Sequence, residues 1–190
     1  KYTEGENSTT LTVAKMPSAV NVTANNIKFG EDAVINIAVP NVVLGVATVV
    51  VNGKSYNVAI VDEKGVLTIS NLAANDYDVK AVYLGDNKYL SSENTTKFTV
   101  SKVGSFVNVA VSDIKVGDDA VINIAVPDDA TGNVTVNING KSYNVTTKYG
   151  MASIKVAGLA NGTYDVKAVY LGDNKYLSSE NTTKFTVSKV

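Results

Sequence analysis

The 190-residue chain contains no cysteine, histidine, tryptophan, glutamine or arginine. Without cysteine and histidine it has no disulfide, no zinc finger, no thiol nucleophile and no imidazole base. Without arginine it has no bidentate clamp for a phosphate group. All 17 basic residues are lysine, and 18 acidic residues bring the net charge to -1. We therefore expect neither an enzyme nor a nucleic-acid-binding protein, because a basic surplus is also missing.

Long apolar runs are missing as well. The longest run, Val42 to Val51, is interrupted by Gly45 and Thr48 and is far shorter than the ~18 residues of a membrane span. We expect no membrane insertion by this part of the protein. Hydrophobic residues still make up 45% of the chain and charged residues 18%, which is typical of a folded chain with a core.

An internal repeat of 87 residues organises the chain. The segment Val79–Lys102, VKAVYLGDNKYLSSENTTKFTVSK, recurs letter for letter as Val166–Lys189. Alignment of residues 16–102 with 103–189 needs no gap and gives 54 identities in 87 positions. We therefore expect one domain over 16–102 and a second over 103–190.

The two copies differ mainly in two windows, 41–51 and 59–76. In the second window, Gly65 lies two residues further from the shared NGKSYNV motif than Gly150 does in the other copy. Because glycine marks turns, this shift predicts that one turn has moved within an unchanged period.

Residues 1–15 match the end of a repeat. Lys1-Tyr2 falls on Lys88-Tyr89, and Thr12-Val13 falls on Thr99-Val100. We interpret this segment as the last strand of a preceding repeat. A strand without its own domain needs a partner, so we expect residues 6–13 to add to a sheet edge, of a neighbouring chain in preference to the first domain of the same chain.

Apolar residues alternate with polar ones, as in half-buried strands, and no segment has a clean helical stripe. Valine, isoleucine, threonine and tyrosine are frequent, which suits a pleated sheet. The alternation predicts a core made of Ile35, Ile37, Val49, Val51, Val79, Ala81, Phe98 and Val100, with their counterparts 87 residues on. The strands of each repeat are expected near 18–24, 32–40, 46–52, 54–61, 66–70, 77–84 and 96–102, in the numbering of the first repeat.

Turn signals separate these strands. Asn52-Gly53 and Asn139-Gly140 each stand between two alternating segments, which is the strongest short signal for a hairpin. About seven short strands with a turn every 8–12 residues indicate an immunoglobulin-like sandwich. The predicted fold class is all-β, with two such sandwiches in tandem and a terminal strand from an upstream repeat.

The run Gly162–Tyr176, GTYDVKAVYLGDNKY, followed by SSENTTKFTV, resembles the carboxyl-terminal half of bacterial-type immunoglobulin-like (Big-type) repeats. Such repeats occur in tandem in large adhesin-like surface proteins of bacteria and methanogenic archaea, and the composition is most similar to the archaeal versions. The resemblance implies an extracellular, cell-surface location. It also implies partners that are neighbouring repeats, copies of the same chain, or glycans and proteins of a host or partner cell.

Seven Asn-x-Ser/Thr sequons are candidate glycosylation sites in an exported protein. Asn94 and Asn181 are equivalent, lie before the last strand and are the preferred sites. The alternative is a β-rich chain that places asparagine and threonine on outward positions. The other candidates are Asn7, Asn21, Asn133, Asn144 and Asn161.

Acidic turns are weak candidates for calcium, through Asp86, Asp173, Asp32 and Asp119. Calcium needs six to eight oxygens from several segments, and a two-residue turn supplies two or three. The alternative is an aspartate that caps its own turn. No other cofactor is expected.

Several tyrosines and lysines have structural interpretations. Tyr77 and Tyr164 enter the sixth strand and resemble a tyrosine corner, in which the hydroxyl bonds back to the linking backbone. Tyr89 and Tyr176 are expected to cover the end of the sandwich; stacking on a sugar is the alternative. A Lys–Asn cross-link from Lys28 or Lys115 is not expected, because nothing interrupts the apolar face.

The residues and the resemblance together favour a structural stalk or fibre module of a surface protein. The alternative is a carbohydrate- or protein-binding adhesion module with its specificity in windows 41–51 and 59–76. An accessory domain of an enzyme is a third interpretation, and no catalytic constellation supports intrinsic activity.

Overall fold

The computed structural model describes residues 1–190, and all of its regular structure is β-strand. The chain folds as two compact units. The two sequence repeats are described separately below. The structure contains no helix that is long and apolar enough to cross a membrane.

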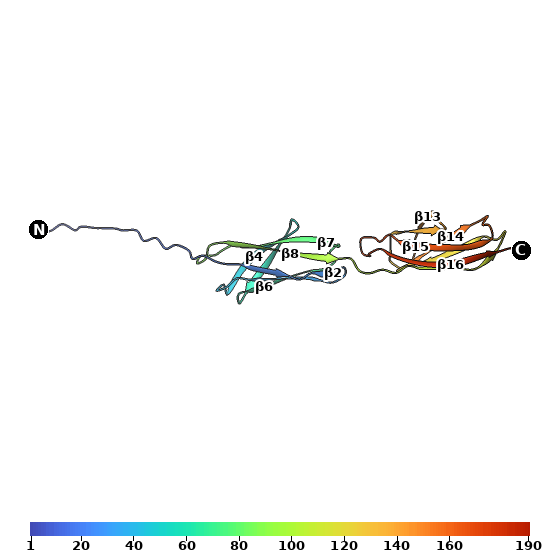
Figure 1. Ribbon diagram of the computed structural model, residues 1–190. Coiled ribbons are helices and arrows are strands. Elements are labelled where there is room, and N and C mark those ends of the chain that lie inside the picture. Colours follow the sequence, from blue (N-terminus) through green and yellow to red (C-terminus); the bar gives the residue numbers. More distant parts are fainter. The chain divides into compact units, whose positions relative to one another are not determined.

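Eight strands form the first repeat (Figure 1). They are β1 (Asn21–Ala24), β2 (Ile27–Lys28), β3 (Ala33–Ala38), β4 (Leu44–Val51), β5 (Lys54–Val61), β6 (Lys64–Ile69), β7 (Asn75–Tyr83) and β8 (Ser92–Ser101).

The second repeat has the same eight strands in the same order. They are β9 (Asn108–Val111), β10 (Ile114–Lys115), β11 (Ala120–Ala125), β12 (Asn133–Ile138), β13 (Lys141–Thr146), β14 (Met151–Val156), β15 (Gly162–Tyr170) and β16 (Ser179–Ser188).

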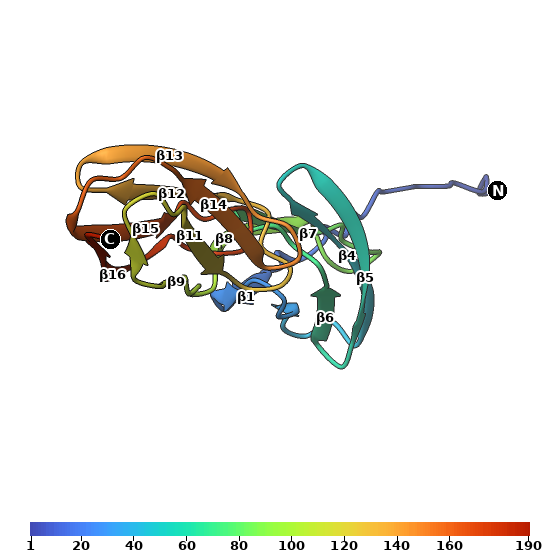
Figure 2. The same cartoon turned by 90° about the vertical axis from the view of Figure 1, so that its right-hand side faces the viewer.

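Each repeat is a two-layer sandwich, which confirms the predicted fold class. In the second repeat a three-stranded sheet, β14-β11-β9, faces a five-stranded sheet, β10-β16-β15-β12-β13. The first repeat has the same two layers, β1-β3-β6 and β5-β4-β7-β8-β2, and the pair Val61–Lys64 joins them into one continuous sheet. Figure 2 shows β4 and β5 as a long hairpin beside β6.

The alternating side chains meet between the layers. All eight predicted core residues of the first repeat and their eight counterparts in the second are buried. No polar or charged residue is buried in either repeat. The cores are therefore held by apolar burial, which stabilises a fold in proportion to the area removed from water.

Both Asn-Gly hairpins form as predicted. Asn52 and Gly53 have positive φ angles of 43° and 87°, and Asn139 and Gly140 have 45° and 92°. Val51 pairs directly with Lys54 across the first turn. Two positive φ angles define the type I′ turn, whose twist matches that of the flanking strands.

The first predicted strand, near 18–24, forms as β1, and an additional short strand, β2, follows it in the other layer. β1 pairs antiparallel with β3, whereas β2 crosses to the other layer and pairs parallel with β8. Asn26 lies between them, and its side-chain oxygen accepts a hydrogen bond from Thr99 N at 2.8 Å. The sequence did not predict β2 because two residues are too few to show alternation.

The prediction that one turn has moved is wrong. In the first repeat Asp62 and Glu63 adopt positive φ angles of 50° and 71°. Their equivalents 87 residues on, Tyr149 and Gly150, have 51° and 75°. Gly65 lies instead inside β6, where a Cβ would come within 2.9 Å of the Ile60 side chain. The first copy therefore makes its turn without glycine and uses glycine for close packing.

Residues 1–15 lie outside every strand and are exposed along their whole length. The first backbone pairing of the chain is at Met16, which bridges to Tyr89. Residues 6–13 make no ladder hydrogen bonds within the chain, so their addition to a sheet edge of their own first domain is wrong, and addition to a neighbouring chain stays a prediction. Apolar Leu11 and Val13 alternate there as in β8, but the segment has no second strand to pair with.

The core assignment can be tested at Phe98, which is 2% exposed and stacks on Tyr77 with ring centroids 5.1 Å apart. We expect Phe98→Ala to lower the free energy of unfolding of the first repeat by about 3–5 kcal/mol, the range for truncating a buried aromatic ring. Chemical denaturation of the chain measures this. The control is Leu44→Ala, which alters a side chain that is 72% exposed and should cost about 0.5 kcal/mol or less. Equal costs for the two variants would reverse the assignment of faces.

Candidate functional site

A short loop between the last two long strands is identical in the two repeats. We call it the clamp loop: Gly85–Leu90 in the first repeat and Gly172–Leu177 in the second. Asp86 organises the first loop, because its Oδ1 accepts hydrogen bonds from Lys88 N and Tyr89 N, both at 2.7 Å. Gly85 has a φ of 80°, and a Cβ there would come within 2.8 Å of Tyr89 O. Gly85 and Asp86 therefore specify a tight loop, because a residue with a Cβ does not fit at Gly85.

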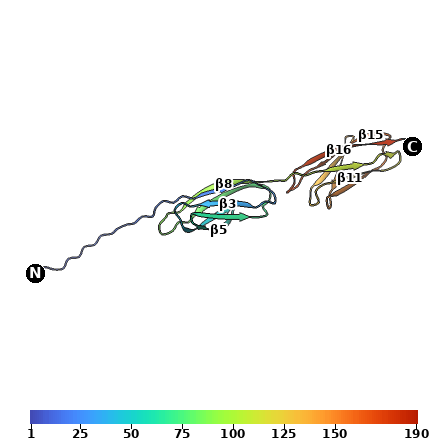
Figure 3. The ribbon, with the colours of Figure 1, turned by 90° about the horizontal axis from the view of Figure 1, so that it is seen from below.

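The clamp loop binds the start of its own repeat. Met16 N donates to Lys88 O at 2.8 Å, and Leu90 N donates to Met16 O at the same distance. Ser18 Oγ then donates to Leu90 O at 2.7 Å. The first residues of the repeat are thereby paired with the segment that leads into β8, whose course is visible in Figures 1 and 3.

The second repeat reproduces these bonds. Val103 N donates to Lys175 O at 2.9 Å, Leu177 N donates to Val103 O at 2.8 Å, and Ser105 Oγ donates to Leu177 O at 2.6 Å. Methionine and valine therefore serve equally at the first position, because the contact is made by the backbone.

A buried tyrosine donates a hydrogen bond to the aspartate of each clamp loop. Tyr83 Oη donates to Asp86 Oδ2 at 2.9 Å, and Tyr170 Oη donates to Asp173 Oδ2 at 2.6 Å. Burial, together with the neighbouring carboxylate, raises the pKa of Tyr83 and of Tyr170 to about 12. Both phenols are therefore held protonated as donors.

The pKa values of Asp86 and Asp173 are shifted in the opposite direction, downward. Backbone hydrogen bonds from Tyr89 and Lys88 hold the pKa of Asp86 below its usual range. Burial alone would raise the pKa of Asp173, but the hydrogen bonds from Tyr170, Thr131 and the loop backbone outweigh it and lower this pKa strongly.

The second clamp loop has additional partners from the segment before β12. Thr131 N donates to Asp173 Oδ2 at 2.8 Å. Asp129 accepts from Lys175 Nζ at 2.7 Å and from Tyr176 Oη at 2.6 Å. These partners lie in the part of the repeat that differs between copies, so the identical loops are anchored to different extents.

The calcium candidates are not brought together. Asp86 and Asp173 already use their carboxylate oxygens as acceptors for the loop. Asp32 and Asp119 are exposed and lie in the turns before β3 and β11. Nowhere in the chain do three or more acidic side chains converge as metal ligands would.

The predicted structural tyrosines lie in the sandwich as follows. Tyr164 Oη donates to Ala160 O at 2.8 Å, which is the contact of a tyrosine corner, and its ring stacks on Phe185 at 5.2 Å. Tyr77 is buried against Phe98. Lys28 and Lys115, the lysines considered for a cross-link, are both exposed.

All seven sequon asparagines are exposed. Asn94 and Asn181 lie in β8 and β16, and each accepts a hydrogen bond from the next backbone N–H, at 2.8 and 2.9 Å. Asn7 lies in the segment before the first repeat, and Asn161 in the turn before β15. The remaining three lie in strands: Asn21 in β1, Asn133 in β12 and Asn144 in β13.

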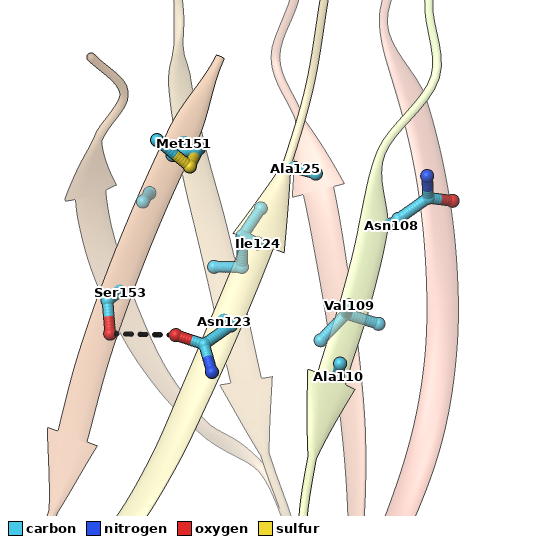
Figure 4. A pocket seen from close by; sticks show the side chains of 9 residues that line it. Asn108, Val109, Ala110, Asn123, Ile124, Ala125, Met151 and Ser153 are labelled. Atoms are coloured by element: carbon cyan, nitrogen blue, oxygen red, sulfur yellow. Dashed lines mark hydrogen bonds between the residues drawn. The ribbon is translucent and has the colours of Figure 1, made fainter. Parts of the chain in front are cut away.

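A hollow on the outer face of the three-stranded sheet was not predicted. In the second repeat it has a volume of about 540 Å³, and β9, β11 and β14 line it (Figure 4). The equivalent hollow of the first repeat, over β1, β3 and β6, is about 310 Å³. In the hollow of the second repeat, Ser153 Oγ donates a hydrogen bond to Asn123 Oδ1 at 3.3 Å, which joins β14 to β11.

The hollow offers contact surface and no reactive group. Small outward side chains such as Ala110 and Ala125 leave the space, and Met151 forms part of its wall. No acidic side chain or lysine lines the hollow of the second repeat, so it has neither a general base nor a charged ligand for a metal. The only sequence signal was alanine at outward strand positions, which is too common to interpret.

The two variable windows meet in space at one end of the first repeat. Asn41 N donates to Glu63 Oε1 at 2.6 Å, and Asp62 N donates to Val43 O at 2.8 Å. The same region exposes several apolar side chains of β4, β5 and the segment before them: Val43, Leu44, Val46 and Val61. The two variable windows therefore contact each other at this end of the first repeat.

Comparison with known proteins supports the fold. Residues 107–188 match the family model described as Bacterial Ig-like domain (group 3). No curated protein matches the chain in sequence. Among solved structures, titin domains Z1Z2 in complex with telethonin are 14% identical with a TM-score of 0.52, over 94% of this chain and all of that one.

Weaker structural matches were also found. A structure from work on host cell surface retention of a 1.5-MDa bacterial ice-binding adhesin is 15% identical, with a TM-score of 0.39, over 93% of this chain and 66% of that one. Fibronectin(III)-like modules of Clostridium thermocellum CbhA are 15% identical, with a TM-score of 0.40, over 90% and 94%. At 14% identity, the likeness to titin Z1Z2 concerns the fold alone.

The anchoring of the clamp loop gives a prediction for Asp173→Asn. We expect this variant to destabilise the second repeat by about 1.5–3 kcal/mol at neutral pH, the range for hydrogen bonds to a charged group. Asp86→Asn should cost the first repeat less, because Asp86 has no counterpart of the Thr131 bond. Denaturant titration of both variants measures the difference, and equal costs would contradict it.

The effect of Asp173→Asn on the stability of the second repeat should depend on pH. The folded-state pKa of Asp173 lies below the unfolded value of about 3.9. Its contribution is therefore fully present above that value and is lost as the pH falls below it. The stability gap between the unmodified chain and Asp173→Asn should be constant from pH 5 to pH 8 and shrink below about pH 4. A gap that does not depend on pH in the acid range would show that the charge is unimportant.

Proposed function

We propose that the chain is a pair of load-bearing structural repeats of the bacterial Ig-like kind, from the stalk or fibre of a large extracellular surface protein. In this proposal residues 16–102 and 103–190 are the two repeats, and residues 1–15 are the end of a preceding one. Immunoglobulin-like domains are typically structural and not catalytic, and we propose no enzyme activity for this chain.

The observation that carries the proposal is the parallel pairing of the terminal strands in each repeat. Ile27 pairs parallel with Val100, and Ile114 pairs parallel with Val187. Met16–Tyr89 and Val103–Tyr176 are parallel bridges as well. Because the first and last strands run in the same direction, the chain enters a repeat at one end of the sandwich and leaves it at the other.

This arrangement suits a module that is pulled from its two ends. Tension along the chain loads parallel hydrogen bonds along the strand direction, so several bonds must break together before the repeat opens. The clamp loop adds the two backbone bonds of Met16 or Val103 and a serine hydroxyl to the same set. A core without a buried charge, in which the tyrosine hydroxyls donate to the clamp loops, is consistent with a mechanical role.

Single-molecule pulling on the chain tests this proposal. We expect two separate unfolding events, one for each repeat, and each should lengthen the chain by somewhat less than about 300 Å, because 87 extended residues span at most about 3.3–3.6 Å each and the length of the folded repeat is subtracted. Removal of the hydrogen bond from Met16 N to Lys88 O by Met16→Pro should lower the force of one event and leave the other unchanged, since proline lacks the N–H donor.

Gradual lengthening without discrete events would contradict a load-bearing role. The control for the added proline is Ala14→Pro. It places a proline at an exposed position outside the repeat and should change neither event.

A second candidate function rests on the surface where the variable windows meet. A binding module for a carbohydrate or a protein, with its specificity in 41–51 and 59–76, is favoured by the exposed apolar side chains there. Val43, Leu44 and Val61 are between 53% and 72% exposed. Apolar side chains at this exposure are typical of contact surfaces when they are contiguous.

Glycan and surface-protein arrays probed with the chain distinguish the two functions. The stalk proposal predicts no specific binding by the unmodified chain. Specific binding that Leu44→Ser and Val61→Ser abolish would instead establish the adhesion function. Thr131→Ser alters the position equivalent to Leu44 in the second repeat and serves as the matched control.

A further inference from the structure

The outer face of the β12–β13 hairpin combines two complete sequons. One begins at Asn133 and ends at Thr135 in β12, and the other begins at Asn144 and ends at Thr146 in β13. Asn133, Asn144 and Thr146 are exposed, and Thr135 is half-buried. We call this surface the sequon face.

The strand register interleaves the two sequons. Asn133 pairs with Thr146, and Thr135 pairs with Asn144. Each asparagine therefore lies directly opposite the hydroxyl residue of the other sequon. Thr135 Oγ1 donates to Asn144 Oδ1 at 3.3 Å, which places this pair in contact.

The first repeat shows that the fold does not require these residues. Its hairpin has the same register, with Val46 opposite Ala59 and Thr48 opposite Asn57. Val46 and Ala59 stand where the second repeat has Asn133 and Thr146. The hairpin of the first repeat therefore has no sequon, and these two differences on one face give the second repeat its two sequons. By contrast, the sequons at Asn94 and Asn181 lie within the stretch that is identical in both repeats.

We propose that the sequon face is an N-glycosylation site, at which a single glycan is carried by either Asn133 or Asn144. The proposal rests on the extracellular placement proposed above, because N-glycans are attached to exported proteins. β13 is the edge strand of its sheet and is paired on one side only, by β12. The sequon at Asn144 is therefore open to an enzyme from the other side.

The chemistry uses a polyprenyl-phosphate- or pyrophosphate-linked oligosaccharide as donor. The side-chain amide nitrogen attacks the anomeric carbon, a C–N bond forms, and the bond from that carbon to the phosphate oxygen breaks. The lipid phosphate leaves with the electron pair, and the amide nitrogen loses one proton to a base of the transferase. The hydroxyl residue two positions on completes the recognition motif.

The register explains why only one glycan fits. A sugar on Asn133 covers Thr146, on which recognition of Asn144 depends, and a sugar on Asn144 covers Thr135 in the same way. The two asparagines are diagonal neighbours on adjacent strands, about 7–8 Å apart at most. Modification of one sequon in the folded repeat therefore blocks the other.

Peptide mass spectrometry of the protein isolated from the surface of the cells that make it tests the proposal. Cleavage after Lys141 separates Asn133 from Asn144, and a partial digest that leaves Lys141 uncut reports on both in one molecule. We expect glycan on each asparagine in a part of the molecules and on both in none. Thr146→Ala, which destroys only the second sequon, should shift the whole occupancy to Asn133.

The first repeat supplies the matched gain of function. Val46→Asn completes a sequon with Thr48, and Ala59→Thr completes the one that begins at Asn57. The double variant changes exposed positions and should acquire one additional glycan, whereas Val46→Thr with Ala59→Val, which completes no sequon, should acquire none.

The outcomes separate this inference from the proposed function. Glycan at Asn94 or Asn181 but at neither Asn133 nor Asn144 overturns the inference and leaves the proposed surface placement intact. Protein at the cell surface that carries no glycan at all has the same two consequences. Both asparagines occupied in one molecule overturn the exclusion. Protein found only inside the cell overturns the proposed function and the inference with it.

Discussion

Each repeat depends on the backbone pairing between its first residues and its clamp loop. Without that pairing, the chain that enters the sandwich would have no backbone pairing before β1 or β9, and the parallel pair of the terminal strands would be only two residues long at Ile27–Lys28 or Ile114–Lys115. A single aspartate organises the loop by accepting hydrogen bonds from two of its amides and from a buried tyrosine. The polar groups at this end of the sandwich are thereby satisfied, which buried or half-buried polar groups require.

The sequence predicted most of the fold because its signals are local and repeated. Alternation identified the core face correctly at Ile35, Val79 and Phe98, and the Asn-Gly dipeptides marked two hairpins. The gapless alignment gave the two copies. What it missed has physical causes: β2 is too short to show a period, and glycine was interpreted as a turn marker although Asp62 and Glu63 adopt the positive φ angles.

The candidate sites were less predictable, since they depend on which residues become neighbours. The acidic turns were considered for calcium, but Asp86 and Asp173 are acceptors within their own loops. The hollow over β9, β11 and β14 arises from small side chains on three separate strands, so no motif announces it. Likewise, the seven sequons were visible in the sequence, but the opposition of Asn133 and Thr146 follows only from the strand register.

Native-state hydrogen exchange tests most directly whether the entering segment, the clamp loop and the sandwich form one cooperative unit. The amides of Met16, Leu90, Val103 and Leu177 make the pairing bonds. They are predicted to exchange only with the global unfolding of their repeat, at the rates of the core strands. Exchange of these four amides at the rate of an exposed loop, while β7 and β15 stay protected, would contradict the account.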